Sequence, residues 1–375
     1  MSALFSNVSQ LNWQQVVMWC IGGLLIYLAI RKDMEPTLLL PLGFGAILVN
    51  LPMSGAVTQV YDGIAEIGVI DVLFDAGIAN ELFPLLLFVG IGAMIDFEPL
   101  LTNPKLMIFG AAAQFGIFFT LSLAALFGFD LKDAASIAII GAADGPTSIF
   151  VANYFHSKYI GAIMVAAYSY MALVPVVQPP VIKLLTTKQE RRIRMVCQQR
   201  SVSKITKILF PIAITVITGI VSPRSVALIG FLMFGNLIRE CGVLDSLSET
   251  AQKVLANLVT LFLGITIATK MQAQYFLTAE TLLILGLGLV AFVFDTAGGV
   301  IFAKILNLFL PKDSKINPMI GAAGISAFPM SARVVHKLGR AEDPQNFLLM
   351  PAVGVNVSGQ IASVIAGGLI LNLLG

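Results

Sequence analysis

Long apolar runs separated by short polar segments make up most of this chain. A helix needs about 20 apolar residues to cross a bilayer, and many of these runs approach that length. The pattern predicts roughly ten to twelve membrane segments, and therefore an all-α polytopic membrane protein. The predicted segments are 16–30, 38–49, 82–94, 106–127, 160–177, 208–221, 226–238, 254–269, 282–309 and 347–374.

Two further apolar stretches, 134–152 and 319–335, contain Gly, Pro and small hydroxyl residues. These residues interrupt a helix, so the stretches are typical of broken or re-entrant helices rather than of plain membrane spans.

Short sequences from the first half of the chain recur in the second half in the same order. Leu-Phe-Val-Gly-Ile at 87–91 is echoed at 261–265, and Ile-Gly-Ala-Ala at 140–143 is repeated at 320–323. Each Ile-Gly-Ala-Ala precedes a break-rich stretch. We therefore expect two structural repeats with an ion site between them near the bilayer midplane, and inverted topology if the helix count between them is odd.

A basic polar stretch, 183–207, lies near the middle of the chain and contains a single acid, Glu190. The positive-inside rule predicts a cytoplasmic loop that links the two halves. A second interpretation, based on charge alone, is a docking site for an acidic soluble partner.

Composition excludes several classes of protein. Hydrophobic residues make up 57% of the chain and charged residues 12%, with a mean hydropathy of +0.90, which excludes a soluble enzyme. The net charge of +2 comes from scattered residues, so we expect no nucleic-acid binding. Cys20, Cys197 and Cys241 have neither disulfide nor metal-site spacing. Nothing resembles a nucleotide-binding motif.

Asp144 is the first candidate for chemistry, because a carboxylate within an apolar segment usually faces a cavity, a partner or an ion. The Gly-Pro pair that follows must interrupt the helix and free backbone carbonyls, and Thr147 and Ser148 add hydroxyl oxygens. Such an oxygen-only set suits sodium or a proton. The alternative is an Asp that caps the second half-helix, and both interpretations can hold together.

The second half offers matching polar residues. Ser326 follows its break, and Asn356, Ser358 and Gln360 lie on an apolar helix, where they could add oxygen ligands opposite Asp144. The alternative for these residues is hydrogen bonding between packed helices.

Several further polar residues remain open to more than one interpretation. Tyr170 could pass on a proton, although hydrogen-bonding tyrosines are commoner. Arg333, near His336, could anchor a carboxylate or simply reach the membrane interface. Asp295 could pair with a basic residue or line the ion pathway.

Longer motifs run through both halves of the chain. They are Glu-Leu-Phe-Pro-Leu-Leu-Leu-Phe-Val-Gly-Ile-Gly-Ala-Met at 81–94, Gly-Ala-Ala-Asp-Gly-Pro-Thr-Ser at 141–148, Ala-Ala-Tyr-Ser-Tyr-Met at 166–171, Gln-Pro-Pro at 178–180, Gly-Asn-Leu-Ile-Arg-Glu-Cys-Gly at 235–242 and Val-Asn-Val-Ser-Gly-Gln at 355–360. From about Pro41 to the C-terminus the chain resembles the beta subunit of the sodium-translocating, biotin-dependent decarboxylases. That family includes oxaloacetate, methylmalonyl-CoA, malonate and glutaconyl-CoA decarboxylases.

The resemblance implies an enzyme subunit of the translocase class in the bacterial cytoplasmic (inner) membrane. It would decarboxylate carboxybiotin, export sodium and consume a proton. Biotin would be attached to a separate carrier subunit. The implied partners are this carrier, a carboxyltransferase subunit, a small gamma or delta membrane subunit and further beta subunits, for which we expect a trimer. The acid substrate stays open, with an acyl-CoA such as glutaconyl-CoA or methylmalonyl-CoA favoured by the compact chain.

The resemblance also assigns roles to residues. Asp144 matches the family's intramembrane aspartate, which binds sodium in alternation with a proton, and Tyr170 matches the tyrosine that passes a proton to carboxybiotin. Arg333 is the expected anchor for carboxybiotin. The remaining expected sodium ligands are Asn317, Gly321, Ser326, Asn356, Thr147 and Ser358.

An elevator-like movement of the repeats against a scaffold is the implied mechanism. The expected divisions are N-terminal scaffold and oligomer helices at 1–80, a first repeat at 81–182, the basic linker at 183–207, connecting scaffold helices at 208–257 and a second repeat at 258–375. The rival function is a sodium/proton exchanger or a sodium-coupled carboxylate transporter, which would use Asp144 and Asn356 without decarboxylation.

Overall fold

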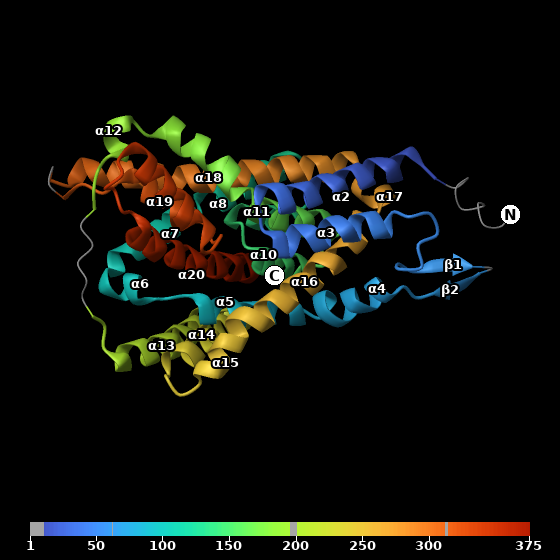
Figure 1. Ribbon diagram of the computed structural model, residues 1–375, viewed down its shortest axis with the longest axis horizontal. Coiled ribbons are helices and arrows are strands. Elements are labelled where there is room, and N and C mark those ends of the chain that lie inside the picture. Colours follow the sequence, from blue (N-terminus) through green and yellow to red (C-terminus); the bar gives the residue numbers. More distant parts are fainter. Residues whose placement is uncertain (1–10, 62, 196–200, 312–313) are drawn as a thin grey trace.

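The computed structural model describes residues 11–61, 63–195, 201–311 and 314–375, and this part of the chain is almost wholly helical (Figure 1). The two strands that it contains, β1 (Gln59–Tyr61) and β2 (Ile64–Glu66), form an antiparallel hairpin with Val60 opposite Ala65. The hairpin projects from the end of the molecule at which the described chain begins. The prediction of an all-α protein is therefore confirmed apart from this small hairpin.

The first half of the chain contains α2 (Trp13–Lys32), α3 (Pro36–Val49), α4 (Val69–Phe74), the π-helical turn η2 (Asp75–Ala79), α5 (Leu82–Met94), α6 (Glu98–Thr102), the 3₁₀ turn η3 (Pro104–Leu106), α7 (Met107–Ala113), α8 (Phe115–Leu126), α9 (Leu131–Ala138), the 3₁₀ turn η4 (Ile139–Ala142), α10 (Gly145–Tyr154) and α11 (Ile160–Leu185).

The second half contains α12 (Lys188–Arg191), α13 (Lys204–Val221), the 3₁₀ turn η5 (Pro223–Ser225), α14 (Val226–Glu240), α15 (Asp245–Glu249), the π-helical turn η6 (Thr250–Leu255), α16 (Ala256–Ile267), the 3₁₀ turn η7 (Ala268–Met271), α17 (Ala273–Phe276), α18 (Ala279–Phe309), the 3₁₀ turn η9 (Pro318–Gly324), α19 (Met330–Glu342) and α20 (Leu349–Leu374).

Seven helices within the described ranges are long and apolar enough to cross a membrane, or eight if the bent pair of 69–79 and 82–94 counts as one span. This is fewer than the ten to twelve segments expected from the apolar runs. The run at 38–49 forms a helix of 14 residues and that at 226–238 one of 15, and both break-rich stretches divide into shorter pieces. The chain is nevertheless a multi-pass membrane protein.

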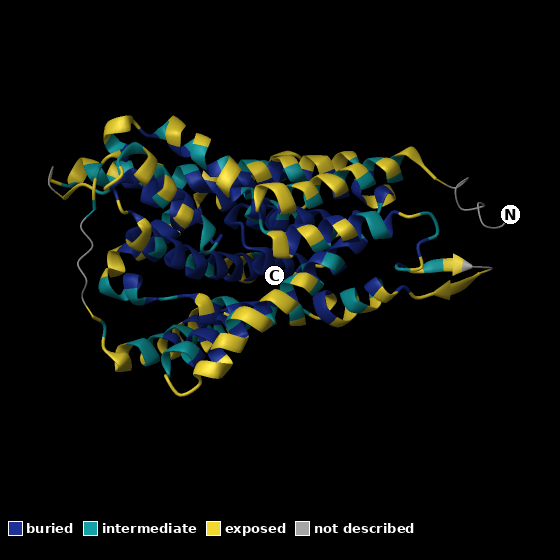
Figure 2. Ribbon diagram, in the orientation of Figure 1, coloured by how far each residue is buried: buried dark blue, intermediate teal, exposed yellow. Residues whose placement is uncertain are grey.

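Exposed residues occur along much of the outer helices (Figure 2), and many of them are large and apolar. Ile220 on α13 is 78% exposed, and Leu24 on α2 is 55% exposed. A water-soluble protein rarely exposes apolar surface on this scale, whereas lipid tails cover it at no cost. The exposed faces of α2 and α13 are therefore the faces expected to meet lipid.

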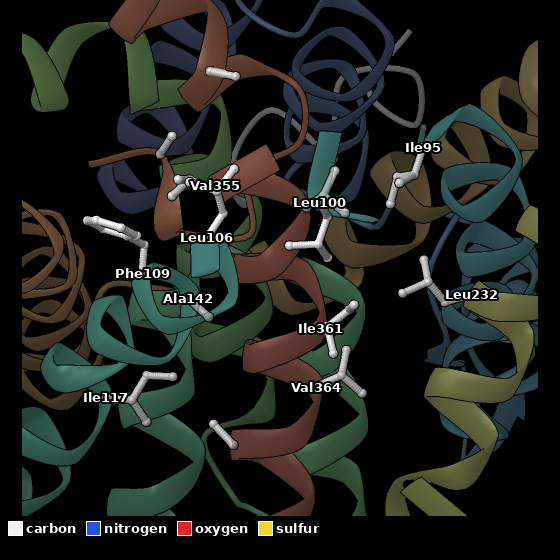
Figure 3. Close-up of a cluster of buried hydrophobic side chains, with 14 of the residues drawn as sticks. Ile95, Leu100, Leu106, Phe109, Ile117, Ala142, Leu232, Val355, Ile361 and Val364 are labelled. Carbon is white, nitrogen blue, oxygen red and sulfur yellow. The ribbon is translucent and has the colours of Figure 1, made fainter. Parts of the chain in front are cut away.

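The buried core centres on α20 and the elements around it (Figure 3). Ile361 and Val364 of α20 belong to one apolar cluster with Phe109 of α7 and Leu232 of α14. Because α20 packs against α7, η9 and α19, its side chains lie in the interior of the molecule rather than toward lipid.

Both halves follow the same order of elements. In each, a broken stretch (η4 and α10, or η9 and α19) precedes a helix of 26 residues, α11 or α20. This order agrees with the predicted repeats and places one break in each half. Inverted topology and elevator movement stay predictions.

The predicted linker 183–207 is shorter than expected. Helix α11 continues to Leu185, so Lys183 is helical, and α13 already begins at Lys204. The turn of α12 lies between them, and Cys197 lies outside the described residues.

Candidate functional site

The first break presents Asp144 at the start of a helix. η4 ends at Ala142, Ala143 adopts a left-handed conformation with φ 50°, and Asp144 is the N-cap of α10. Pro146 lies in the first turn of α10, where a missing N–H costs nothing. The carboxylate therefore lies at the positive end of the α10 dipole, which favours a negative charge.

Three side chains donate hydrogen bonds to the same oxygen of Asp144, which is 3% exposed. Thr147 Oγ1 lies 2.7 Å from Oδ2, and Gln360 Nε2 and Ser363 Oγ each lie 3.1 Å from it. Within the described ranges, the side chains that donate to Asp144 all reach Oδ2, and no basic side chain forms an ion pair with this carboxylate. Oδ1 is therefore not held by any side chain of the described residues.

The second break lies directly against the first. The backbone N–H of Ser326, just after η9, donates to the carbonyl of Ala142 at 2.9 Å. Ser326 Oγ donates to Gly359 O of α20 at 3.1 Å. The two halves of the chain therefore meet at their breaks, as the repeat predicted.

Helix α20 brings three polar side chains to this meeting point on one face. Asn356, Gln360 and Ser363 follow one another at spacings of four and three residues, which places them above one another on a helix. Asn356 Nδ2 donates to Ile325 O at 2.7 Å, whereas its Oδ1 is buried and accepts no hydrogen bond. This oxygen is a second free acceptor beside the breaks.

Helix α18 passes both breaks and adds a third free acceptor, the hydroxyl of Thr296. Phe292 packs in one cluster with Ala143 and Ile325, and a Cβ on Gly299 would clash with Gly321 O. Thr296 lies between these positions, and its buried hydroxyl has no partner. Carboxylate, amide and hydroxyl oxygens with free acceptors suit a hard cation such as sodium. The described residues contain no cluster of three or more His, Cys, Asp or Glu.

The other expected sodium ligands are engaged elsewhere. Ser358 Oγ donates to the carbonyls of Leu106 and Val355, at 3.0 and 2.7 Å. Gly321 meets Gly299 where η9 and α18 touch. Thr147, Ser326 and Asn356 are thus the expected ligands that the structure brings around Asp144.

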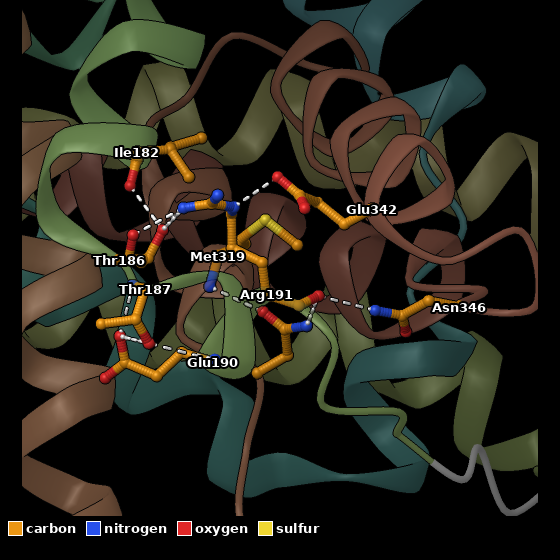
Figure 4. A network of polar contacts seen from close by, with 9 residues as sticks. Ile182, Thr186, Thr187, Glu190, Arg191, Met319, Glu342 and Asn346 are labelled. Atoms are coloured by element: carbon orange, nitrogen blue, oxygen red, sulfur yellow. Dashed lines mark hydrogen bonds and ion pairs between the residues drawn. The ribbon is translucent and has the colours of Figure 1, made fainter.

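Asn317 lies at the N-cap of η9, and its side chain binds the linker between α11 and α13 instead of contributing to the site at Asp144. Its Nδ2 donates to the carbonyls of Arg191 and Ile193, at 2.9 and 2.8 Å. Arg191 is itself buried, pairs with Glu342 of α19 at 2.8 Å, and accepts a further bond from Asn346 at its carbonyl (Figure 4). This basic residue is therefore a structural anchor and not part of a solvated loop.

Two tyrosines of α11 point in opposite directions. Tyr170 donates its hydroxyl to Leu285 O of α18, and its ring lies against Gly288. The ring of Tyr168 lies so close to Gly145 that a Cβ there would clash, and its buried hydroxyl has no partner. The structure therefore places Tyr168, and not Tyr170, beside the start of α10.

Arg333 is exposed on α19 and forms no ion pair with the described residues. His336 lies one turn further along the same helix, where burial and then the nearby charge of Arg340 lower its pKa. Glu35, in the turn between α2 and α3, has a pKa raised by burial and lowered in part by the charge of Arg333. The charge of Arg333 is thus felt at the turn between α2 and α3.

Three residues of the site escaped the sequence-based reasoning: Ser363, Thr296 and Tyr168. Ser363 could have been found, because it continues the helical spacing of Asn356 and Gln360. Thr296 and Tyr168 carry no such signal, since only the packing of α18 and α11 determines which face meets the breaks.

Comparison with known proteins identifies the family. Residues 14–374 match the family model described as the Na⁺-transporting oxaloacetate decarboxylase beta subunit. The chain is 48% identical to the glutaconyl-CoA decarboxylase subunit beta of Acidaminococcus fermentans, with 97% of this chain and 94% of the relative covered. It is 46% identical to the methylmalonyl-CoA decarboxylase subunit beta of Propionigenium modestum, with 97% and 96% covered. It is 44% identical to the oxaloacetate decarboxylase beta chain of Klebsiella pneumoniae, with 95% of this chain and 94% of the relative covered. The chain therefore belongs to the family of the beta subunits of sodium-transporting decarboxylases.

Proposed function

We propose that this chain decarboxylates carboxybiotin and couples the reaction to sodium export through a site at Asp144. The observation that carries the proposal is the buried carboxylate of Asp144, which has no basic partner among the described residues and lies where the two breaks touch. A sodium ion bound there would offset the charge that is otherwise costly inside a membrane. Sodium is the cargo of this site.

The energy source follows from the chemistry of carboxybiotin. Decarboxylation breaks the bond between the biotin nitrogen and the carboxyl carbon and releases CO₂. The electron pair stays on the ureido group, and one proton is taken up at the nitrogen. Asp144 can alternate between sodium and a proton, because its ionised form attracts either cation. Sodium binding and proton delivery would therefore use the same carboxylate in turn.

Arg333 is the proposed anchor for the carboxybiotin carboxylate. A guanidinium matches a carboxylate bidentately, and exposure on α19 suits a residue that meets a group delivered by another subunit. The Arg191–Glu342 pair ties α19 to the basic linker, which the positive-inside rule places on the cytoplasmic side. Carboxybiotin would therefore arrive from the cytoplasm.

We place the moving and static parts by their packing. α5 packs against α14, and α16 packs against α3. Gly92 of α5 and Gly235 of α14 each lie where a Cβ would clash with a carbonyl of the other helix. We assign these four helices to the scaffold, against which the elements around Asp144 would move. This assignment moves two helices to the scaffold: α5, which the sequence placed in the first repeat, and α16, most of which it placed in the second repeat.

The proposed assembly contains a carboxyltransferase subunit, a biotin carrier subunit, a small gamma or delta subunit and a trimer of this chain in the cytoplasmic membrane. The three relatives named above are subunits of decarboxylases of glutaconyl-CoA, methylmalonyl-CoA and oxaloacetate, and their identities to this chain are similar, at 48, 46 and 44%. An acyl-CoA acid is the proposed substrate of the complex. The carboxyltransferase would determine it, since no acyl-CoA is handled at Asp144.

Asp144→Asn tests the site in the assembled complex. The amide keeps the shape and removes the charge, so sodium affinity should fall by about 100-fold, equivalent to about 3 kcal/mol, and sodium-dependent decarboxylation should stop. Asp130→Asn is the matched control, because Asp130 is an exposed N-cap at the start of α9. Unchanged sodium affinity in a folded Asp144→Asn complex would overturn the proposal.

A further inference from the structure

The second break is held by amide side chains from three of the helices that surround it. In each case an amide nitrogen donates a hydrogen bond to a carbonyl oxygen of the break. The three pairs are Gln178 Nε2 of α11 with Ala322 O at 2.7 Å, Gln114 Nε2 of α7 with Gly324 O at 3.4 Å, and Asn356 Nδ2 of α20 with Ile325 O at 2.7 Å. Helices that lie far apart in the sequence therefore meet at one short piece of backbone.

The break itself creates the need for these donors. The 3₁₀ turn η9 ends at Gly324 and α19 begins only at Met330, so the backbone between them is not helical. Inside a membrane, a carbonyl that leaves a helix must find another donor. Residues 318–329 contain no ionisable side chain, and an amide supplies N–H groups without adding a charge. The second break therefore stays neutral.

The two glutamines use their amide nitrogens twice. Gln178 Nε2 also donates to Ser331 Oγ in the first turn of α19 at 3.2 Å, so it links α11 to both arms of the break. Gln114 Nε2 also donates to Gly110 O of its own helix at 2.9 Å, which fixes the side chain on α7. Both amides are therefore held in one orientation toward the break.

The oxygens of the three amides show that the N–H groups are what the break uses. Gln178 and Asn356 are 0% exposed and Gln114 is 4% exposed. All three amide oxygens are buried and accept no hydrogen bond within the described ranges. An apolar side chain of the same size would fill the space without burying an unpaired oxygen. Packing alone therefore does not account for three amides at these positions.

The peptide group between Ile325 and Ser326 is held from both sides. Its carbonyl accepts from Asn356, and its N–H donates to Ala142 O of the first break at 2.9 Å. Because a peptide group is planar and rigid, whatever orients the carbonyl also orients the N–H. The first break has no amides of this kind: among the described residues, its carbonyls accept from backbone N–H groups and from the hydroxyl of Ser148. The contact between the breaks thus depends on how the second break is held.

We propose that Gln114 and Gln178 are positioning residues for the sodium site. Together with Asn356, they hold the second break so that Ser326 meets the first break beside Asp144. Their N–H groups bond to the carbonyls of 324 and 322, so both glutamines act on the site through the backbone of the break. The inference rests on the proposed function, since the sodium site at Asp144 is the site that they would position.

Gln178→Met in the assembled complex tests the proposal. Methionine has a similar size and lacks the donor, and Ala322 O keeps a hydrogen bond from Ser331 Oγ at 3.1 Å, so the fold should be retained. Only the tie from the break to α11 is lost. We expect the equilibrium affinity for radioactive sodium to fall by about tenfold, with the decarboxylation rate at saturating sodium close to that of the wild type.

Asn236→Leu is the matched control. Asn236 of α14 is 1% exposed, donates to Ile95 O at 2.9 Å, and has a buried oxygen without a partner among the described residues. It therefore resembles the three amides in burial and bonding but lies away from both breaks. The control should lower the unfolding temperature and leave sodium affinity unchanged. An equal loss of sodium affinity in Gln178→Met and Asn236→Leu would overturn the inference.

A double-mutant cycle with Ser326→Ala asks whether Gln178 acts through the break. A misplaced Ser326 contributes less to the site, so the loss of affinity in the double variant should be smaller than the product of the two single losses. A loss equal to that product would show that the two residues act independently, which contradicts a positioning role for Gln178.

The outcomes separate this inference from the proposed function. Wild-type sodium affinity in Gln178→Met, together with a loss in Asp144→Asn, overturns the positioning role alone. Wild-type affinity in Asp144→Asn overturns the proposed function and this inference with it. If Gln178→Met fails to assemble, Gln114→Met decides. Its bond of 3.4 Å to the break is long and therefore weak, so a loss of about threefold is expected. A binding curve identical to that of the wild type would contradict the inference.

Discussion

Asp144 divides its two oxygens between structure and function. Oδ2 collects three donors, from Thr147, Gln360 and Ser363, and these hold the carboxylate in one orientation. Oδ1 receives no hydrogen bond from a side chain of the described residues, and we propose that it binds the ion. Hydrogen bonds to a charged group stabilise it by about 1.5–3 kcal/mol each, so the donors keep the buried group able to ionise without a basic partner.

Removal of one donor should therefore weaken sodium binding without abolishing it. We expect Ser363→Ala to lower sodium affinity by about tenfold, because the ionised carboxylate loses one of its three stabilising bonds. Ser331→Ala is the control: Ser331 is also buried, but its hydroxyl donates to Ala322 O and does not touch Asp144. Sodium-dependence curves of decarboxylation measure both. An equal effect in the two variants would mean that Ser363 acts only through packing.

The two tyrosines of α11 form a matched pair for the proton path. The family resemblance assigns the proton to Tyr170, so Tyr170→Phe should slow decarboxylation by about 100-fold and leave sodium binding intact. Tyr168→Phe removes the same atom from the opposite face, next to Gly145. Single-turnover decarboxylation of carboxybiotin compares them. A rate loss in Tyr168→Phe alone would transfer the proton role to Tyr168.

At the scale of elements, the linker and α19 are held together by a buried ion pair. Arg191 and Glu342 have side chains that are 8% and 17% exposed, with 2.8 Å between Nε and Oε1. Arg191 also donates to Thr186. Since α19 carries Arg333, this pair fixes the helix that presents the proposed anchor for carboxybiotin.

Glu342→Gln should destabilise the protein by about 3 kcal/mol, because it leaves Arg191 buried without its counter-charge. The neighbouring pair of Arg194 and Asp343 supplies the control, since the Arg194 side chain is 56% exposed. Asp343→Asn should leave the unfolding temperature almost unchanged, because solvent screens an exposed pair. Thermal unfolding in detergent measures both variants. Equal losses would show that burial of Arg191 does not decide the cost.

The start of α13 is tied to α6 by Lys207 and Glu98, with 2.6 Å between Nζ and Oε2. The hydrogen bond from Lys207 lowers the pKa of Glu98 from its ordinary value of 4.5. A lowered carboxyl pKa gives stability that is present above pH 4.5 and is lost as the pH falls through the folded value.

Glu98→Gln should therefore be slightly less stable than the wild type near neutral pH, and the difference should vanish on acidification. Unfolding temperatures of both proteins over a pH series test this. The effect is small, since the pair is partly solvated and salt screens it. A difference that grows toward acid would contradict the assigned sign.

For the whole molecule, local sequence signals predicted the elements and the central carboxylate. The Asp-Gly-Pro-Thr stretch must break a helix wherever it lies, so Asp144 and Thr147 could be predicted from their neighbours alone. The contact between Ser326 and Ala142 follows from the repeat, because matched breaks meet between the two halves.

Features that depend on packing could not be predicted in this way. Asn317 was expected at the sodium site, but its side chain turns toward the carbonyls of Arg191 and Ile193. Seven or eight of the described helices are long and apolar enough to cross a membrane, fewer than the expected ten to twelve, because the runs at 38–49 and 226–238 extend to helices of only 14 and 15 residues. The rotation of α11 about its axis determines which of its two tyrosines lies near Asp144. Gly145 and Gly288 leave space for the rings of Tyr168 and Tyr170, because a glycine has no side chain.

We propose that carboxybiotin decarboxylation drives sodium through this chain. The most direct measurement is uptake of radioactive sodium into inverted vesicles that contain the assembled complex and carboxylated biotin carrier, with and without avidin. We expect uptake that requires carboxybiotin, stops with avidin and is absent in Asp144→Asn. Uptake that ignores avidin and follows an imposed pH gradient would contradict it and would instead identify a sodium/proton exchanger.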